Sequence, residues 1–267
     1  FGVSQCLQEI PVSTGSPLAK ANQVTRRTNK GLVWRVKRPL QAERMNERIF
    51  LVASDGGSLV GMPCEGSQLG VSVSLAGPEV LEQETDVCVM EAMSQCLRRQ
   101  ARSSMGVEVG AVNMAMEHGD FAKAILSEIQ DPDFDVRNWR SCIARWRQIG
   151  VIDAKTAFDS LSGDGVPEDR RTAVDIAAVK ADLEDESNTS LRWIPGEQQA
   201  SDDLTKWLGN GLMAVLLATG RWCIKEDPDI REKRKQLRER RSILKAERKA
   251  AENEANPIGK SADVLRE

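Results

Sequence analysis

Short apolar runs between residues 49 and 93 predict strands. Residues 49–53 form one continuous apolar run that stops near Asp55, where two glycines follow and favour a turn. Residues 67–76 alternate between polar and apolar positions, as in a strand that pairs with the first. Residues 80–93 allow a third strand, although 87–93 also fits a helical turn. The pattern therefore predicts a hairpin with Asp55 at the C-terminal edge of its first strand.

Helical periodicity begins after Ser103 and alternates with two further strands. Ser103 is a suitable N-cap for a helix over 105–129, which Gly119 and Asp120 are expected to break or kink. Glu108 shares the apolar face of this helix with Ala111, Val112, Ala115, Ala122 and Ile125. The remaining pattern predicts a surface connection with a short helix over 131–147, strands over 150–153 and 190–194, and helices over 154–161, 168–184, 201–207 and 211–218. The inward face of helix 168–184 is expected to hold Val174, Ala177, Ala178 and Ala181. This strand-helix-strand rhythm indicates an α/β fold.

Composition divides the chain into three parts. An apolar content of 40% is enough for a packed core, which we place in residues 46–224. Residues 1–45 are interpreted as a connection segment or loop; their basic stretch fits an approach to the domain and equally a solvated charged face. Residues 225–267 are rich in Lys, Arg, Glu and Ala without a clear apolar stripe, and are interpreted as a charged helical or disordered tail.

Several protein classes are disfavoured by composition. The net charge of −3 argues against coating nucleic acid by bulk electrostatics, and the absence of Tyr argues against base-stacking platforms. Six cysteines without a C-x-x-C pair and a single His argue against zinc and a disulfide framework. There is no apolar run of membrane-spanning length and no signal pattern. We therefore expect an intracellular protein, cytoplasmic or nuclear, that is neither secreted nor bound to a membrane.

Four acids occupy positions where a fold can gather them. Asp55 and Asp153 follow predicted strands, Glu108 lies on the inner face of a helix, and Asp202 begins a late helix. Carboxylate oxygens suit Mg²⁺, and two metal ions roughly 3.5–4 Å apart can activate a water and stabilise the leaving oxygen of a phosphodiester. Each acid also has an ordinary alternative: a turn aspartate, a helix cap, a surface acid and an acid favoured by a helix dipole, respectively for Asp55, Asp153, Glu108 and Asp202.

The wording and order of several short segments are more specific than composition. They are SPLAKANQV at 16–24, SDGGS at 54–58, SQLG at 67–70, RSSMGVE at 102–108, VIDAKTAFD at 151–159, RRTAVDIAAV at 170–179, LRWIPG at 191–196 and QASDDLTK at 199–206. In this order they resemble the ribonuclease H domain of copia-type retrotransposon Pol polyproteins, preceded by the end of the reverse transcriptase connection. The resemblance covers roughly residues 16–222, and the reverse transcriptase acid motif is missing.

The resemblance implies the ribonuclease H-like fold, a mixed five-stranded sheet with helices on both faces. It also implies catalysis by two Mg²⁺ or Mn²⁺ ions held by the four acids. In that family pattern Asp55 bridges both ions, Glu108 holds one near the scissile phosphate and the 2′-hydroxyl, Asp153 shares the ions, and Asp202 holds the ion that orients water. The implied substrate is an RNA·DNA hybrid, and an upstream reverse transcriptase domain is a candidate partner; the oligomeric state stays open.

The sequence also departs from the family pattern. Val107 and Ser201 stand where the family usually has Ala, and the adjacent Asp202 and Asp203 leave the identity of the last ligand ambiguous. Residues 131–148 are longer than the family pattern predicts. Our first hypothesis is an endonuclease for the RNA strand of RNA·DNA hybrids. The alternatives are a catalytically inactive remnant that acts as a nucleic-acid or protein interaction module, and a different hydrolase or transposase of the same fold.

Overall fold

A mixed sheet of six strands forms the centre of the computed structural model, which describes residues 35–36, 47–58, 66–97, 101, 103–163, 169–185, 188–206 and 210–225. The strands are β1 (Ile49–Ser58), β2 (Ser67–Ala76), β3 (Thr85–Cys96), β4 (Arg147–Ile152), β5 (Thr189–Trp193) and β6 (Arg221–Trp222). The α-helices are α3 (Ser104–Gln130), α4 (Trp139–Ile143), α5 (Lys155–Ser162), α6 (Arg170–Asp185) and α7 (Leu212–Thr219). Short 3-10 helices are η2 (Pro78–Leu81), η3 (Val136–Asn138), η4 (Gly196–Gln198) and η5 (Ala200–Leu204). The predicted connection and charged tail lie almost entirely outside the described residues.

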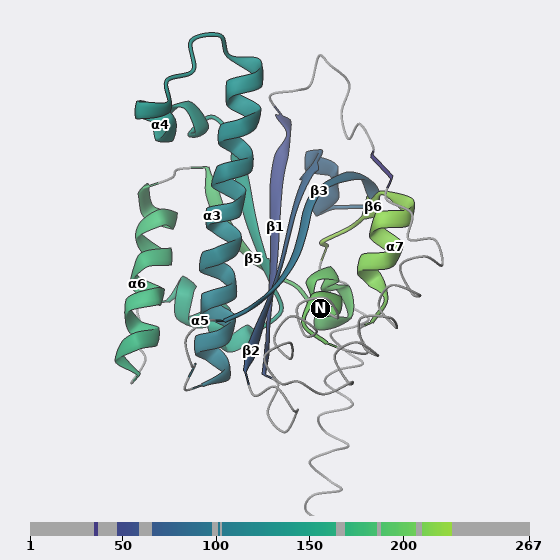
Figure 1. Cartoon of the computed structure of the whole chain (residues 1–267). Helices are drawn as coiled ribbons and strands as arrows, with labels where there is room; N and C mark the ends of the chain where they lie inside the picture. Colours follow the sequence, from purple (N-terminus) through teal and green to yellow (C-terminus); the bar gives the residue numbers. More distant parts are fainter. Residues whose placement is uncertain are drawn as a thin grey trace, which may run out of the picture. The chain divides into compact units, whose positions relative to one another are not determined.

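The sheet has the order β5-β4-β1-β2-β3-β6 (Figure 1). The first three strands form an antiparallel meander, whereas β4 pairs parallel to β1 and β5 parallel to β4. The chain reaches β4 through α3 and reaches β5 through α5 and α6, because parallel strands require crossover connections. This topology confirms the expected ribonuclease H-like α/β architecture. The sheet has six strands instead of five because the two-residue β6 pairs with the edge of β3.

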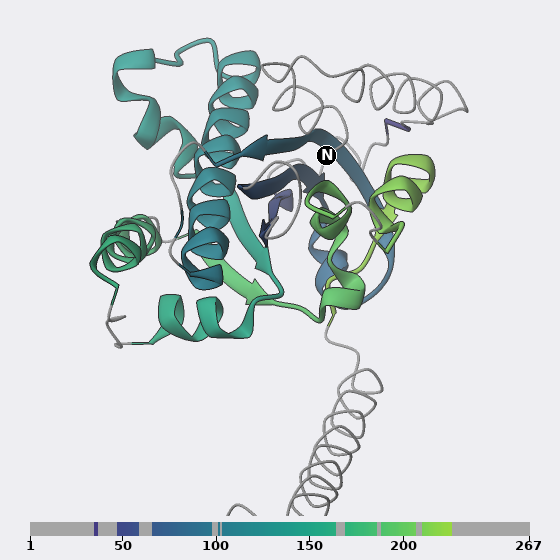
Figure 2. The same ribbon diagram turned by 60° about the horizontal axis from the view of Figure 1, so that its bottom comes forward.

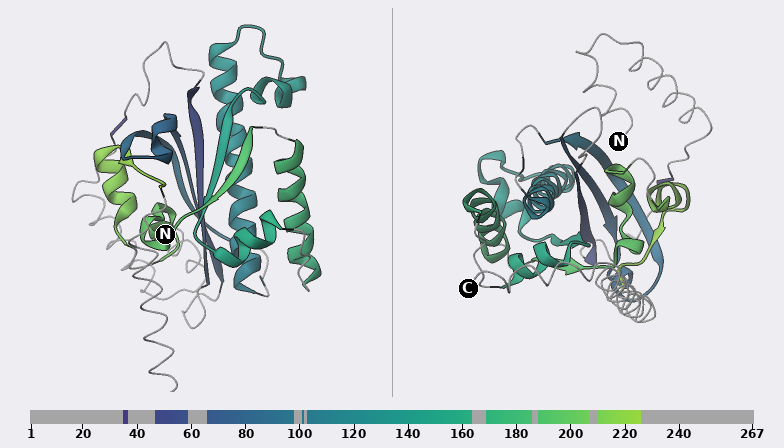
Figure 3. Two further views of the ribbon diagram at one scale, coloured as in Figure 1. Left: turned by 180° about the vertical axis from the view of Figure 1, so that it is seen from behind. Right: turned by 90° about the horizontal axis from the view of Figure 1, so that it is seen from below.

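The two faces of the sheet pack against different helices. Phe50 and Val52 of β1 belong to the hydrophobic core that includes residues of α3, α5 and α6, whereas Ile49 and Leu51 belong to the core that includes residues of α7. Successive strand residues point to opposite faces, so β1 is buried on both sides. Figures 1 and 2 show α3 and α6 on one side of the sheet and α7 on the other, and the rear view in Figure 3 agrees.

Helix α3 spans 27 residues without a break. Ser103 caps it as predicted, because its side chain accepts a hydrogen bond from the Gly106 amide at 3.1 Å. The expected break at Gly119 is wrong, because the helix continues through it. A Cβ at Gly119 would lie 2.5 Å from Gln148 Oε1 and 2.6 Å from Val52 Cγ1. The glycine therefore allows the helix to pack closely on the sheet. None of the described helices is long and apolar enough to cross a membrane.

Two other sequence expectations need correction and one ambiguity is settled. The buried residues of α6 are Thr172, Ile176 and Val179, whereas Val174, expected to point inward, is 69% exposed. The alanines at 177, 178 and 181 are exposed as well. Exposing them costs little free energy, because an alanine side chain has a small apolar surface. On α3, Ile125 was expected on the inner face but is 40% exposed. Residues 87–93, for which a helical turn was also considered, belong to strand β3.

Candidate active site

Asp55 lies inside β1, three residues before the strand ends, and is only 2% exposed. The predicted turn after it is wrong, because Gly56 and Gly57 continue the strand. A Cβ on Gly56 would lie 2.7 Å from the backbone nitrogen of Glu108, and a Cβ on Gly57 would lie 2.9 Å from Thr205 Cβ. The glycines therefore allow α3 and η5 to approach β1 closely from its two faces.

Gly70 provides the matching space on β2. It pairs with Asp55 across the hairpin, and a Cβ on it would lie 2.8 Å from Leu204 Cβ and 2.9 Å from the Ser201 carbonyl oxygen. Any side chain at this position would push η5 away from the sheet. The glycine that ends the SQLG segment thus sets the distance between η5 and Asp55.

Gln199 anchors the start of η5 on the two central strands. Its fully buried side chain donates from Nε2 to the carbonyl oxygens of Ser54 at 2.9 Å and Val151 at 3.3 Å, and its Oε1 accepts from the Ser201 amide at 3.4 Å. This amide therefore ties η5 to both β1 and β4. Gln199 belongs to the QASDDLTK segment, but its structural role was not anticipated from the sequence.

Three of the four predicted acids meet at this junction. The parallel register pairs Ala53 with Val151, and two residues later come Asp55 in β1 and Asp153 directly after the end of β4. One carboxylate oxygen each of Asp55, Asp153 and Asp202 lies within 4.8 Å of the other two. Asp55 and Asp202 are buried and Asp153 is half-buried. Three hard oxygen donors from β1, the end of β4 and η5 could hold a divalent cation.

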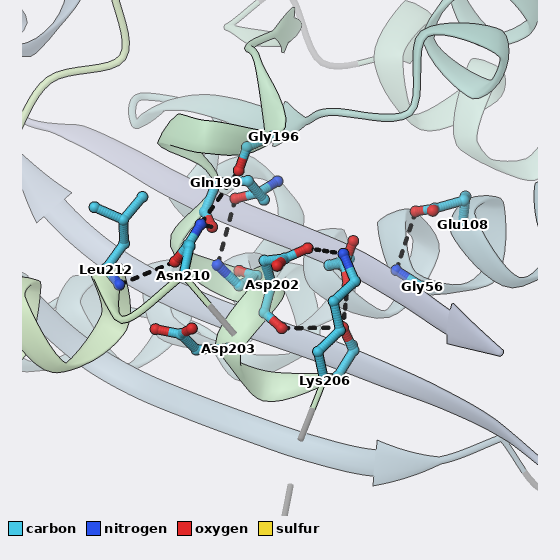
Figure 4. A network of polar contacts seen from close by, with 12 residues as sticks. Gly56, Glu108, Gly196, Gln199, Asp202, Asp203, Lys206, Asn210 and Leu212 are labelled. Carbon is cyan, nitrogen blue, oxygen red and sulfur yellow. Dashed lines mark hydrogen bonds and ion pairs between the residues drawn. The ribbon is translucent and has the colours of Figure 1, made fainter. Parts of the chain in front are cut away.

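Glu108 lies at the edge of this group and is not one of the three convergent acids. Its Oε2 accepts a hydrogen bond from the Gly56 amide at 3.0 Å, directly after Asp55 (Figure 4). Burial, together with the nearby charges of Asp55 and Asp153, raises the pKa of Glu108 to about 8. The glutamate is therefore electrostatically linked to the cluster while its carboxylate is held on the strand.

Burial and neighbouring negative charges disfavour the charged forms of Asp55 and Asp153. Burial raises the pKa of Asp153 to about 6, with the charge of Asp55 as the next cause. Burial also raises the pKa of Asp55, although the Thr205 hydroxyl and the Lys206 ammonium act in the opposite direction. A bound cation reduces the repulsion between desolvated carboxylates that lie close together. The electrostatics of the site therefore fit a metal centre.

Thr205 and Lys206 contact the cluster, although no role was predicted for either of them from the sequence. The Thr205 hydroxyl donates to Asp55 Oδ2. The Lys206 ammonium forms an ion pair with Asp202 Oδ1, which Figure 4 shows. Burial lowers the pKa of Lys206, but the hydrogen bond to Asp202 and the surrounding acids outweigh it, and the net effect is a raised pKa. Spacings of three and four residues from Asp202 are the sequence signal that could have indicated both.

Trp193 positions the backbone that carries Asp153. Its indole Nε1 donates to the carbonyl oxygen of Asp153 at 2.9 Å. The alternative interpretation of Asp153 as a helix cap does not fit, because the cap residue of α5 is Ala154 and no side chain caps that helix. Trp222 is 7% exposed and belongs to the core. His118 pairs with Glu91 at 2.9 Å.

The structure distinguishes Asp202 from its neighbour Asp203. The two carboxylate oxygens of Asp203 accept from the backbone amides of Gly211 and Met213, both at 2.8 Å, at the N-terminal end of α7. Figure 4 shows Asp203 turned away from Asp202 and Lys206. Asp203 therefore binds the start of α7, and Asp202 is the member of the acid cluster.

Replacing Asp203 with alanine is expected to lower the free energy of unfolding by about 1–2 kcal/mol, because two backbone amides of α7 lose their acceptor. Urea unfolding followed by circular dichroism measures the change. Asp159→Ala is the matched control, because Asp159 is an exposed aspartate of α5 that pairs with Lys155. A loss no larger than that of the control would contradict the assigned role.

Comparisons with known proteins give similarity at the level of structure. No family model and no curated protein matches the chain. A ribonuclease H1 isolated from compost by a metagenomic approach is 15% identical, with a TM-score of 0.42 over 60% of this chain and 94% of that chain. The N-terminal RNase H domain of a Mycobacterium tuberculosis protein is 14% identical, with a TM-score of 0.40 over 64% and 99% of the two chains.

A third solved structure is the foamy viral protease-reverse transcriptase in complex with RNA/DNA hybrid. It is 10% identical, with a TM-score of 0.39 over 63% of this chain and 21% of that chain. The strand order and the crossover through α3 described above identify the fold of this chain as ribonuclease H-like α/β.

Proposed function

We propose that the chain hydrolyses the RNA strand of RNA·DNA hybrids with two divalent cations, Mg²⁺ or Mn²⁺. The convergence of Asp55, Asp153 and Asp202 within 4.8 Å carries this proposal. The donor set fits, because it consists of hard carboxylate oxygens and Mg²⁺ and Mn²⁺ prefer oxygen ligands. Glu108 completes the set of four, since its charge is coupled to two of the convergent acids.

The four acids would divide the binding of the two cations among them. Asp55 would hold both, Asp153 would share them, Glu108 would serve the cation near the scissile phosphate, and Asp202 the cation near the attacking water. When bound, such cations make water a better nucleophile and stabilise the leaving oxygen. The Thr205 hydroxyl fixes the orientation of the Asp55 carboxylate. The fold thus supplies oriented ligands before any cation arrives.

The order of the sequence motifs supports a hybrid substrate and a retroelement context. The eight segments that resemble the copia-type ribonuclease H domain include all four acids, and an RNA strand differs from DNA by the 2′-hydroxyl that such sites contact. We therefore infer that the chain belongs to a copia-type Pol polyprotein. Its partners would then be the RNA·DNA hybrid and an upstream reverse transcriptase domain.

Cleavage of an end-labelled RNA·DNA hybrid tests the proposal. The whole chain is incubated with Mg²⁺ or Mn²⁺ and with the hybrid, single-stranded RNA or duplex DNA of the same sequence. We expect cutting of the RNA strand of the hybrid alone, its loss in EDTA and its loss in Asp153→Asn. Asp159→Asn, an exposed aspartate in the same sequence segment, should retain activity.

Absence of cleavage in a folded sample that binds Mn²⁺ would favour the inactive interaction module. Hybrid binding without cutting, measured by fluorescence anisotropy, would support that alternative directly. Cutting of duplex DNA in preference to the hybrid would instead support a different nuclease or transposase of the same fold. Each result is distinct, so the assay separates the three hypotheses.

A further inference from the structure

The ammonium group of Lys206 lies among the carboxylates of the candidate active site. Its Nζ forms an ion pair with Oδ1 of Asp202, four residues earlier in the chain (Figure 4). Its positive charge also offsets part of the rise in the pKa of Asp55, Asp153 and Glu108. One cation of the chain therefore acts on all four predicted acids.

This ion pair differs from an ordinary surface pair in the same chain. Lys155 and Asp159 have the same spacing of four residues, and their side chains are 54% and 58% exposed. In the Lys206 pair the lysine side chain is 50% exposed, but the Asp202 side chain is only 12% exposed. Exposed pairs contribute little to stability, whereas a buried carboxylate without a counter-charge is costly.

We propose that Lys206 is an intramolecular counter-ion that holds the acid cluster together without metal and is displaced when a divalent cation binds. The inference rests on the proposed function, because it takes the cluster to be a cation site. A dication and an ammonium group repel each other, and both would use the oxygens of Asp202. Lys206 has a flexible four-carbon stem and is half exposed, so its ammonium can turn into solvent without a change of backbone.

Two consequences follow from this competition. The metal-free site stays assembled, because one positive charge offsets part of the repulsion among the acids. Cation binding is weaker than the acids alone would allow, because the ion pair with Asp202 must break first. A lysine that only stabilised the fold, or only positioned the Asp202 carboxylate for the cation, would have the opposite effect. Its removal would weaken cation binding.

Calorimetric titration of the metal-free whole chain with Mn²⁺ measures this directly. We expect Lys206→Met to bind the first Mn²⁺ about tenfold more tightly, because removing a charge at close range in a half-exposed site changes the binding energy by this order. Lys206→Arg keeps the charge and should remain close to the unaltered chain. Lys155→Met removes a lysine near Asp153 in sequence and should leave the affinity unchanged.

A second measurement uses only the unaltered chain, so it does not depend on whether a variant folds. The rate at which Lys206 of the unaltered chain reacts with an amine-acylating reagent, followed by mass spectrometry, is expected to rise when Mg²⁺ is added. The rate at Lys155 is expected to stay constant. An unchanged rate at Lys206 overturns the inference.

The remaining outcomes are equally decisive. Equal or weaker Mn²⁺ binding by Lys206→Met overturns the role of Lys206 and leaves the proposed nuclease intact. Failure of both the unaltered chain and the variant to bind Mn²⁺ overturns the inference together with the metal centre. Tighter binding by the variant, in a chain that does not cut the hybrid, supports the counter-ion and rejects the nuclease.

Discussion

Asp55→Asn is expected to reduce hybrid cleavage by at least about a thousandfold while stabilising the metal-free protein, two effects of opposite sign from one substitution. Cleavage falls because Asp55 is the central oxygen ligand of the proposed metal centre. Stability rises because the carboxyl group is buried and its pKa is raised, so its charged form destabilises the fold at neutral pH. The neutral amide has the same shape and its oxygen can still accept from the Thr205 hydroxyl.

The two effects are measured separately. Single-turnover cleavage of the hybrid gives the loss of activity, and thermal unfolding in EDTA at pH 8 gives the change in stability. Asp159→Asn is the control for both, because it removes an exposed carboxylate that pairs with Lys155 outside the cluster. Loss of activity together with a lower unfolding temperature would show that Asp55 supports the fold, and retained activity would reject its place in the metal centre.

The acids were predictable from sequence, but the way the chain brings them together was not. Local patterns placed Asp153 after a strand and Glu108 on an inner helix face, and the structure agrees, because β4 ends at Ile152 and the Glu108 carboxylate accepts from the Gly56 amide of β1. The same patterns assigned the glycines after Asp55 to a turn, because Gly favours turns when only neighbouring residues are considered. Their actual role depends on α3 and η5, which pack against β1 from more than fifty and nearly one hundred and fifty residues away in sequence. Glycine in a strand marks such close approaches only when the approaching element is known.

Buried faces and polar partners were limited in the same way. On α6, local periodicity selected the face of Val174 and Ala178, whereas packing against the rest of the fold buries the face of Ile176 and Val179. The choice between Asp202 and Asp203 depended on where α7 begins, because the amides of Gly211 and Met213 bind Asp203. Such contacts join segments that no local pattern connects. The sequence therefore indicates the chemistry of the site, and long-range packing decides which of several neighbouring residues takes part in it.

A steep pH dependence of stability is expected for the metal-free protein, with Glu108 as its main source. Burial raises the pKa of this carboxyl to about 8 from 4.5, so the folded state binds more protons than the unfolded state between these values. The free energy of unfolding therefore falls as the pH rises from about 4.5 to about 8. Glu108→Gln removes this titration, and at pH 8 the variant should be more stable than the unaltered chain by roughly 2–4 kcal/mol.

Urea unfolding in EDTA at several pH values between 5 and about 8 provides the test. The difference between Glu108→Gln and the unaltered chain should grow with pH, whereas Glu117→Gln, an exposed glutamate of the same helix, should give a constant difference. Mn²⁺ should reverse the loss in the unaltered chain, because a cation that binds only the folded state stabilises it and favours the deprotonated acids. A pH-independent difference would show that the Glu108 carboxyl is not coupled to the acid cluster, and would remove it from the proposed metal centre.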